Sequence, residues 1–194
     1  MARLRYCRLP SINTIAGRSS SITNAFIGAI VPIIPPTEAE ELEVLKLLRI
    51  DPAEIRCAYC GDPATEWDHF RPIVKGKRPT GYITEIANLV PACGKCNQSK
   101  GASDWSQWML GPALRSPKSR KVADLRGRVM RLEKFARWRK PIWLDFEAIA
   151  GRRKWRQHTG NWEATLLLLS QSQLVATEIR SRIQVEAMKR HEAR

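Results

Sequence analysis

Apolar residues at helical spacing follow the proline-rich stretch at residues 32–36. Thr37 and Glu40 have the spacing of a capping box, in which two side chains satisfy free backbone amides at the start of a helix. The apolar positions after them recur every three residues and so share one helix face: Leu42, Leu45 and Leu48. The pattern predicts a helix over about residues 38–49, ending before Asp51-Pro52.

The second half of the chain carries two further helical patterns. The first places basic residues mostly away from a shared apolar face, which is formed by Val122, Leu125, Val129, Leu132 and Ala136. The second follows Asn161, whose side chain suits a helix cap. Its apolar positions suit either a protein core or a dimer seam: Leu174, Ile179 and Ile183.

Residues 55–101 show a different pattern, with short segments separated by Gly and Pro turns. The longest apolar run, residues 22–34, is compatible with either a helix or a strand. Together the patterns predict an α+β protein with a small turn-rich core embedded in helices. We expect an N-terminal arm and helix over 1–54, the core over 55–111 and a basic helical region over 112–194.

The sequence predicts neither a membrane span nor a secretory signal. The apolar run at residues 22–34 is interrupted by Pro32 and is shorter than the ~20 apolar residues of a spanning helix. Near the N-terminus, Arg8, Pro10 and Asn13 interrupt the apolar stretch that a signal peptide requires. We therefore expect a cytoplasmic protein with no membrane partner.

Positive charge dominates the composition and is concentrated in one segment. The formal net charge is +14, and residues 115–156 contain 15 Lys or Arg against 4 Asp or Glu. Such an excess indicates a polyanionic partner, and nucleic acid fits better than a membrane surface here. The densest cluster is Arg152, Arg153, Lys154 and Arg156, which suits either phosphate contact or a solvated helix face.

Four of the five cysteines form two Cys-x-x-Cys pairs: Cys57, Cys60, Cys93 and Cys96. In a reducing compartment such pairs indicate zinc more often than disulfides, with redox chemistry as the alternative. A site closed by four thiolates has no open position, so this zinc is expected to be structural. Cys7 has no partner in the sequence and is expected to be a plain thiol.

The 32 residues between the two pairs carry groups suited to phosphodiester hydrolysis. A neutral imidazole such as that of His69 takes a proton from water near pH 7. A hard divalent cation such as Mg²⁺ stabilises charge on a phosphate, and a carboxylate with an amide suits it as ligands. Asp68 and Asn97 supply that carboxylate and amide, and a zinc knuckle would bring their segments together.

These residues resemble the HNH endonucleases, also called ββα-metal or His-Me finger nucleases. The likeness extends over about residues 56–108 and is to the four-cysteine branch found among bacterial restriction and related defence nucleases. It rests on several motifs in order: the Asp68-His69 pair, Asn88-Leu-Val, the Cys96-Asn97 junction and the following Lys100-Gly. The resemblance implies a small ββα core stapled by a four-cysteine zinc site.

The resemblance also implies a role for each matching residue. His69 corresponds to the general base, Asp68 and Asn97 to ligands of a catalytic metal, and Asn88 to the side chain that braces the loop carrying the histidine. Because the implied protein ligands are all oxygen donors, Mg²⁺ or Mn²⁺ is favoured. Arg71 and Lys100 are expected either to contact DNA phosphates or to be solvated.

The sequence therefore predicts a metal-dependent endonuclease acting on double-stranded DNA, most simply a type II restriction enzyme or related defence nuclease. A homodimer would place two such sites on the two strands of a duplex. One alternative is a non-specific DNA- or RNA-degrading effector, such as a toxin or the partner of a defence ATPase. The other is a zinc-dependent DNA-binding module without catalysis.

Overall fold

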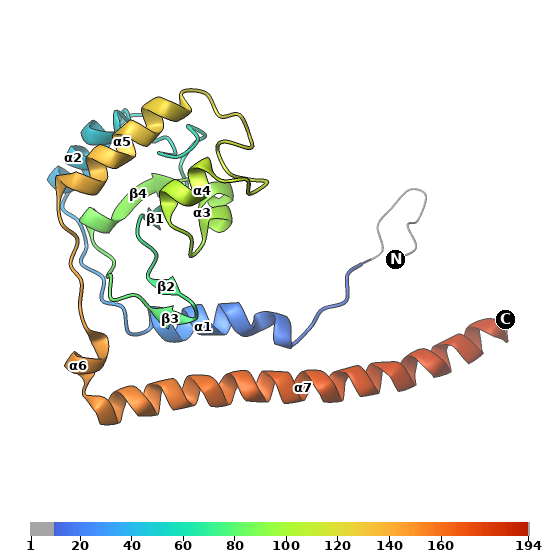
Figure 1. The fold of residues 1–194 in the computed structure, drawn as a ribbon. Coiled ribbons are helices and arrows are strands. Elements are labelled where there is room, and N and C mark those ends of the chain that lie inside the picture. The colour runs from blue at the N-terminus through green and yellow to red at the C-terminus, as the bar shows by residue number, and fades with distance from the viewer. Residues whose placement is uncertain (1–9, 194) are drawn as a thin grey trace. The chain divides into compact units, whose positions relative to one another are not determined.

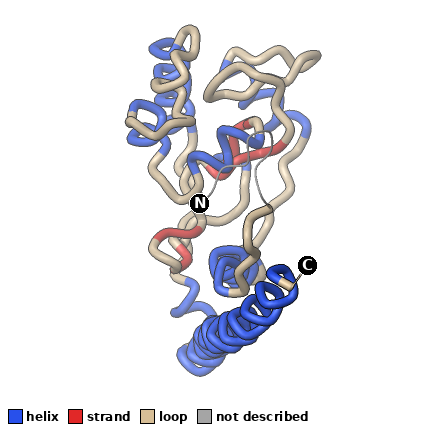
Figure 2. Tube along the Cα trace, turned by 90° about the vertical axis from the view of Figure 1, so that its right-hand side faces the viewer, coloured by secondary structure: helices blue, strands red, loops and turns tan. Residues whose placement is uncertain are grey.

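A computed structural model describes residues 10–193, which fall into two compact units (Figure 1). One unit is Ile27–Ile149, and the other combines residues up to Phe26 with those from Ala150 onward. Helices predominate and the strands are short, as Figure 2 shows. The predicted α+β class is confirmed, while Cys7 lies outside the described residues.

A strand pair followed directly by a helix forms the centre of the Ile27–Ile149 unit. Strand β1 (Glu66–His69) pairs antiparallel with β4 (Leu89–Ala92), and helix α3 (Gly94–Lys100) begins two residues after β4. Between these strands lie a short hairpin, β2 (Val74–Lys75) with β3 (Arg78–Pro79), and the 3-10 turn η2 (Ile86–Asn88). The order β1, β4, α3 is the predicted ββα arrangement.

Helices α2 (Glu38–Leu48) and α5 (Leu125–Trp138) both pack on this core. The predicted capping box is present at the start of α2, with hydrogen bonds in both directions between Thr37 and Glu40. The buried residues that the two helices contribute are Val44, Leu45, Leu48, Leu132 and Phe135. The boundaries expected at residues 54 and 111 leave α2 and α5 outside the core region. In the structure, both helices pack on the core.

The apolar run at residues 22–34 turns out to be part helix and part extended chain. Helix α1 (Ser19–Gly28) takes the first part, and Ile33 forms a bridge with Thr84 in the second. Around this bridge, Ile27, Val31 and Ile83 form a second buried cluster. The run therefore supports the loop that precedes η2, because its apolar residues cover one side of that loop.

The unit formed by the two ends of the chain is dominated by helix α7 (Arg152–Glu192), and also holds η1 (Ala16–Arg18) and most of α1. The α7 helix begins after Gly151 and runs through Asn161, so the predicted cap at Asn161 is wrong. Its Trp162 indole donates to Thr23 Oγ1 at 3.1 Å, yet no residue of α7 is buried.

Two shorter helices complete the described chain, α4 (Trp105–Leu110) and α6 (Phe146–Ala150). Among residues 10–193, no helix combines the length and the apolar character that a bilayer crossing requires.

Truncation of the Phe135 side chain tests the packing of α5 on the core. Its buried ring meets Phe70 edge-on, with 5.1 Å between ring centroids. Truncation to Ala leaves a cavity between α5 and β1, so Phe135→Ala is expected to lower the free energy of unfolding by about 3–5 kcal/mol. Met130→Ala on the same helix, where the side chain is 53% exposed, should change it by less than about 0.5 kcal/mol in the same denaturant titration. Equal effects of the two changes would contradict the packing.

Candidate active site and metal centre

The four paired cysteines converge at the base of the ββα unit. Their sulfur atoms all lie within 4.8 Å of one another, and the Sγ atoms of Cys60 and Cys93 are 3.7 Å apart. Four sulfurs around zinc at its usual bond length would be about 3.8 Å apart, because zinc sites of this kind are tetrahedral. The geometry and the donor set therefore fit a single structural zinc ion.

Two arginines of the basic segment hold this cysteine cluster. The Arg120 guanidinium donates to Cys96 Sγ at 3.5 Å and to Asp62 Oδ2 at 3.1 Å, and Arg128 donates to the Cys57 carbonyl at 3.3 Å. Hydrogen bonds among the thiols lower the pKa of Cys57 and raise that of Cys96, so Cys57 is the thiol that ionises first. Part of the positive charge thus stabilises the cluster.

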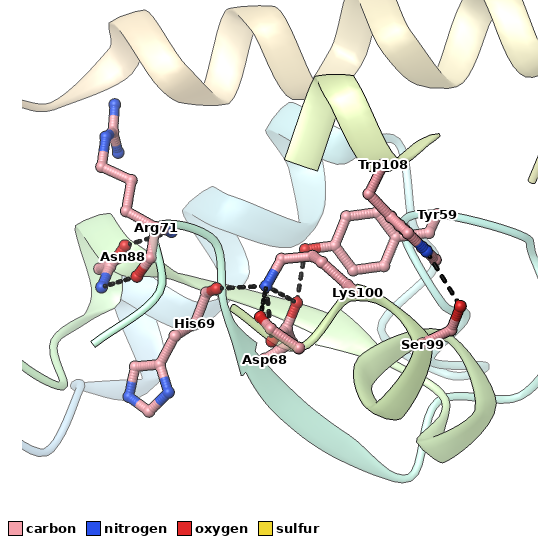
Figure 3. Close-up of polar contacts among 9 residues, drawn as sticks. Tyr59, Asp68, His69, Arg71, Asn88, Ser99, Lys100 and Trp108 are labelled. Atoms are coloured by element: carbon pink, nitrogen blue, oxygen red, sulfur yellow. Dashed lines mark hydrogen bonds and ion pairs between the residues drawn. The ribbon is translucent and has the colours of Figure 1, made fainter. Parts of the chain in front are cut away.

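Asp68 lies in the interior rather than in an open cleft. Its side chain is 4% exposed, and its carboxylate accepts from Tyr59 Oη at 2.6 Å and pairs with Lys100 Nζ at 3.0 Å (Figure 3). Burial raises the pKa of Asp68, whereas the Lys100 charge and the Tyr59 hydrogen bond oppose that rise. Burial and the Asp68 charge raise the pKa of Tyr59, so its hydroxyl stays protonated and donates.

Lys100 is buried, whereas the predicted contact with a DNA phosphate requires an exposed ammonium group. Its side chain is 1% exposed, and its ammonium contacts Asp68 and the main chain of β1 instead of solvent. The interpretation of Lys100 as a DNA contact or a solvated residue is therefore wrong for this structure. The reason is that α3 packs against β1 and encloses its last lysine.

His69 projects from the end of β1, and successive side chains of a strand point to opposite faces. Its imidazole accordingly points away from the Asp68 carboxylate in Figure 3, and its Nε2 lies 2.8 Å from Thr84 Oγ1. Burial, aided by the Lys100 charge, lowers the pKa of His69 to about 4. The imidazole is consequently neutral near pH 7, the state that a general base requires.

Asn88 is buried and bonds the loop that follows His69. Its Oδ1 accepts from the Arg71 amide at 2.8 Å, and its Nδ2 donates to the Arg71 carbonyl at 3.0 Å and the Ile83 carbonyl at 3.2 Å. Both ends of one amide side chain thus fix the backbone two residues beyond the imidazole. Such a buried and fully bonded amide rigidifies the loop.

Asn97 lies on α3, one turn before Lys100. Residues three apart on a helix are neighbours, so Asn97 lies near the part of α3 that contacts β1. Its side chain is half-buried, and its backbone amide donates to the Cys93 carbonyl at 3.0 Å. Asn97 therefore lies along α3 between Cys96 and Lys100.

The side chain of Arg71 is held against the interior. Its guanidinium donates to the Ala136 carbonyl at 3.2 Å and lies near the rings of Phe70 and Tyr82. Its Nη1 is buried without a hydrogen-bond partner among the described residues.

By contrast, the predicted basic cluster at the start of α7 is exposed: Arg152, Arg153, Lys154 and Arg156.

Two residues that contact the site, Tyr59 and Thr84, are not predicted by any motif. Tyr59 lies between the first two cysteines, and the zinc motif explains those cysteines but not the tyrosine. Thr84 lies in a loop that contains no motif. A buried hydroxyl needs a hydrogen-bond partner, so Tyr59 offered a weak signal. Nothing in the local sequence pointed to Thr84, because its contact with His69 depends on the bridge to Ile33.

Part of this chain is similar in sequence to known proteins. Residues 57–103 match the family model described as HNH endonuclease, so the chain carries an HNH endonuclease domain. The chain is 36% identical over 63 residues to the CRISPR-associated endonuclease Cas9 of Corynebacterium diphtheriae, a match that covers 30% of this chain and 5% of that protein. No solved structure matches the chain.

Zinc content tests the cysteine cluster. The purified protein is expected to contain about one zinc ion per chain, and Cys93→Ser should lose it together with cooperative thermal unfolding, because metal binding is coupled to folding in such sites. Metal analysis and a thermal melt measure the two effects. Cys7→Ser is the matched control, since Cys7 has no Cys-x-x-Cys partner, and it should keep the zinc. Full zinc retention by Cys93→Ser would contradict the assignment.

Proposed function

We propose that this protein, whose residues 57–103 form an HNH endonuclease domain, hydrolyses phosphodiester bonds in DNA with the help of a divalent cation. One observation carries the proposal: His69, at the end of β1 in the ββα unit, is held neutral and fixed by Thr84. The chain spans only 5% of the length of the curated relative it matches, so the activity of the whole protein is inferred from its own site.

His69 is the general base in this proposal. When its Nε2–H donates to Thr84 Oγ1, the lone pair of Nδ1 is available to take a proton from the attacking water. Asn88 acts indirectly. It holds the backbone of Arg71 and thereby fixes the loop that follows His69. Thr84 and Asn88 are therefore positioning residues, and His69 is the catalytic one.

Asp68 and Asn97 are the proposed ligands of the catalytic cation. Both offer oxygen atoms, which suits Mg²⁺ or Mn²⁺. When bound, the divalent cation would supply charge stabilisation at the phosphate and the leaving oxygen. The Tyr59 hydroxyl fixes the orientation of the Asp68 carboxylate for that role.

Double-stranded DNA is the proposed substrate, and a type II restriction enzyme or related defence nuclease in the cytoplasm is the proposed role. The support is the net charge of +14 and the exposed basic cluster at the start of α7, formed by Arg152, Arg153, Lys154 and Arg156. Arg71 would serve DNA binding only after leaving its contact with Ala136. A CRISPR-associated endonuclease among the relatives is compatible with a defence role.

Plasmid cleavage tests the catalytic proposal. With Mg²⁺, the wild-type protein should cut plasmid DNA, and His69→Ala should reduce the rate at least about 100-fold because no other base replaces the imidazole. Thr84→Val keeps the imidazole but removes its partner, so a smaller loss is expected. His158→Ala on α7 is the matched histidine control and should cut normally. Unchanged cutting by His69→Ala would remove His69 from the mechanism.

The same digests separate the rival functions. Discrete fragments indicate a sequence-specific enzyme, whereas a smear or loss of RNA indicates a non-specific effector. Binding of DNA without any cleavage by the zinc- and Mg²⁺-loaded protein would leave only the zinc-dependent binding module.

A homodimer is the second part of the proposal. The α7 helix has 41 residues and no buried one, and several large apolar side chains on it are more than half exposed: Leu168, Leu174, Val175, Ile179 and Ile183. Exposed apolar surface of this kind favours association with another molecule. Ile179→Asp should shift the protein to a monomer in light scattering after size exclusion, while Gln184→Asp should not. A wild-type monomer at high concentration would contradict the dimer.

A further inference from the structure

The interior of the nuclease core contains a charged pair, Asp68 with Lys100, of which the proposed mechanism uses only Asp68. Lys100 Nζ lies 3.2 Å from Asp68 Oδ1 and 3.0 Å from Asp68 Oδ2, and it also donates to the His69 carbonyl at 2.9 Å. A fourth acceptor, the Gly101 carbonyl, lies 3.4 Å away. Both side chains are almost wholly enclosed, so the ammonium is fixed by these contacts rather than by solvent.

We propose that Lys100 is a resident counter-ion of Asp68, which the catalytic cation must displace, so that Lys100 sets the affinity of the protein for that cation. The inference rests on the proposed function in one respect, since it takes Asp68 as a metal ligand. It adds a role for Lys100, which neither the sequence motif nor the proposed chemistry explains.

Competition follows from the distances. An ammonium about 3 Å from the carboxylate and a divalent cation on the same carboxylate would be close neighbours of like charge, and in a poorly solvated interior that repulsion is large. The two oxygens of Asp68 also differ. Oδ2 accepts a hydrogen bond from Tyr59 and lies 3.0 Å from Lys100 Nζ, whereas Lys100 is the sole hydrogen-bond partner of Oδ1 among the described residues. Oδ1 is therefore the oxygen that becomes free when the ammonium moves.

The surroundings of Lys100 make this exchange local. The His69 and Gly101 carbonyls remain as hydrogen-bond acceptors for the ammonium when the carboxylate binds the cation. Tyr59 meanwhile keeps its 2.6 Å hydrogen bond to Oδ2, which holds the carboxylate in place for the incoming ion.

The arrangement also explains why a lysine is tolerated in this interior. Without a cation, the buried Asp68 carboxylate would be uncompensated, which is strongly destabilising. Lys100 removes that penalty in the metal-free protein, at the cost of weaker metal binding. The same contact therefore raises the stability of the free protein and lowers its affinity for the divalent ion.

Metal titration of the zinc-loaded full chain tests the inference without measuring cleavage. Lys100→Met keeps the length of the side chain and removes its charge, so it should bind Mn²⁺ at least about tenfold more tightly by calorimetry. Its melting temperature should fall without Mn²⁺ and rise on adding Mn²⁺ by more than that of the wild type. Lys95→Met, an exposed lysine on the same helix, is the matched control and should behave as the wild type.

A second variant keeps the test decisive if Lys100→Met does not fold. Lys100→Gln retains a donor for the two carbonyls and also lacks the charge, so it should show the same tighter binding. Wild-type affinity for Mn²⁺ in a folded uncharged variant would overturn the inference. Asp68→Asn separates this outcome from failure of the metal site: if it binds Mn²⁺ as the wild type does, or if no variant binds at all, the proposed ligand is wrong.

Discussion

The convergence of two Cys-x-x-Cys turns is the constraint on which the nuclease core depends. Strands β1 and β4 have four residues each and α3 has seven, so these elements are too short to be stable alone. The cysteines before β1 and after β4 meet within 4.8 Å and fix the two ends of the intervening chain. The positions of Asp68, His69 and Asn97 all follow from that closure.

A polar centre inside an apolar shell is the second organising feature. Tyr59, Asp68, Asn88 and Lys100 are buried, and each has hydrogen-bond partners. Buried polar networks stabilise a fold only when they are satisfied, and then they specify one arrangement of the chain. Here the network joins the cysteine cluster, β1 and α3, so the geometry around His69 is tied to the packing of the whole core.

The basic segment serves two purposes that its composition alone does not separate. Arg120 and Arg128 bond the cysteine cluster, and Arg139 pairs with Glu40 of α2, so these charges stabilise the nuclease unit itself. The charges at the start of α7 are exposed and form no ion pair among the residues that the structure describes. Net charge therefore overestimates the exposed positive surface, because the tertiary structure uses part of the charge internally.

The sequence by itself determined the local features: the α2 capping box, the amphipathic face of α5 and the two cysteine pairs of the cluster. These follow from spacing, which acts over a few residues. Only the tertiary structure decided that Asp68 pairs with Lys100, 32 residues away, and that His69 meets Thr84. Because successive side chains of a strand point to opposite faces, Asp68 and His69 meet different parts of the chain. Which distant residue each one contacts depends on how the helices and loops pack, and no local sequence pattern contains that information.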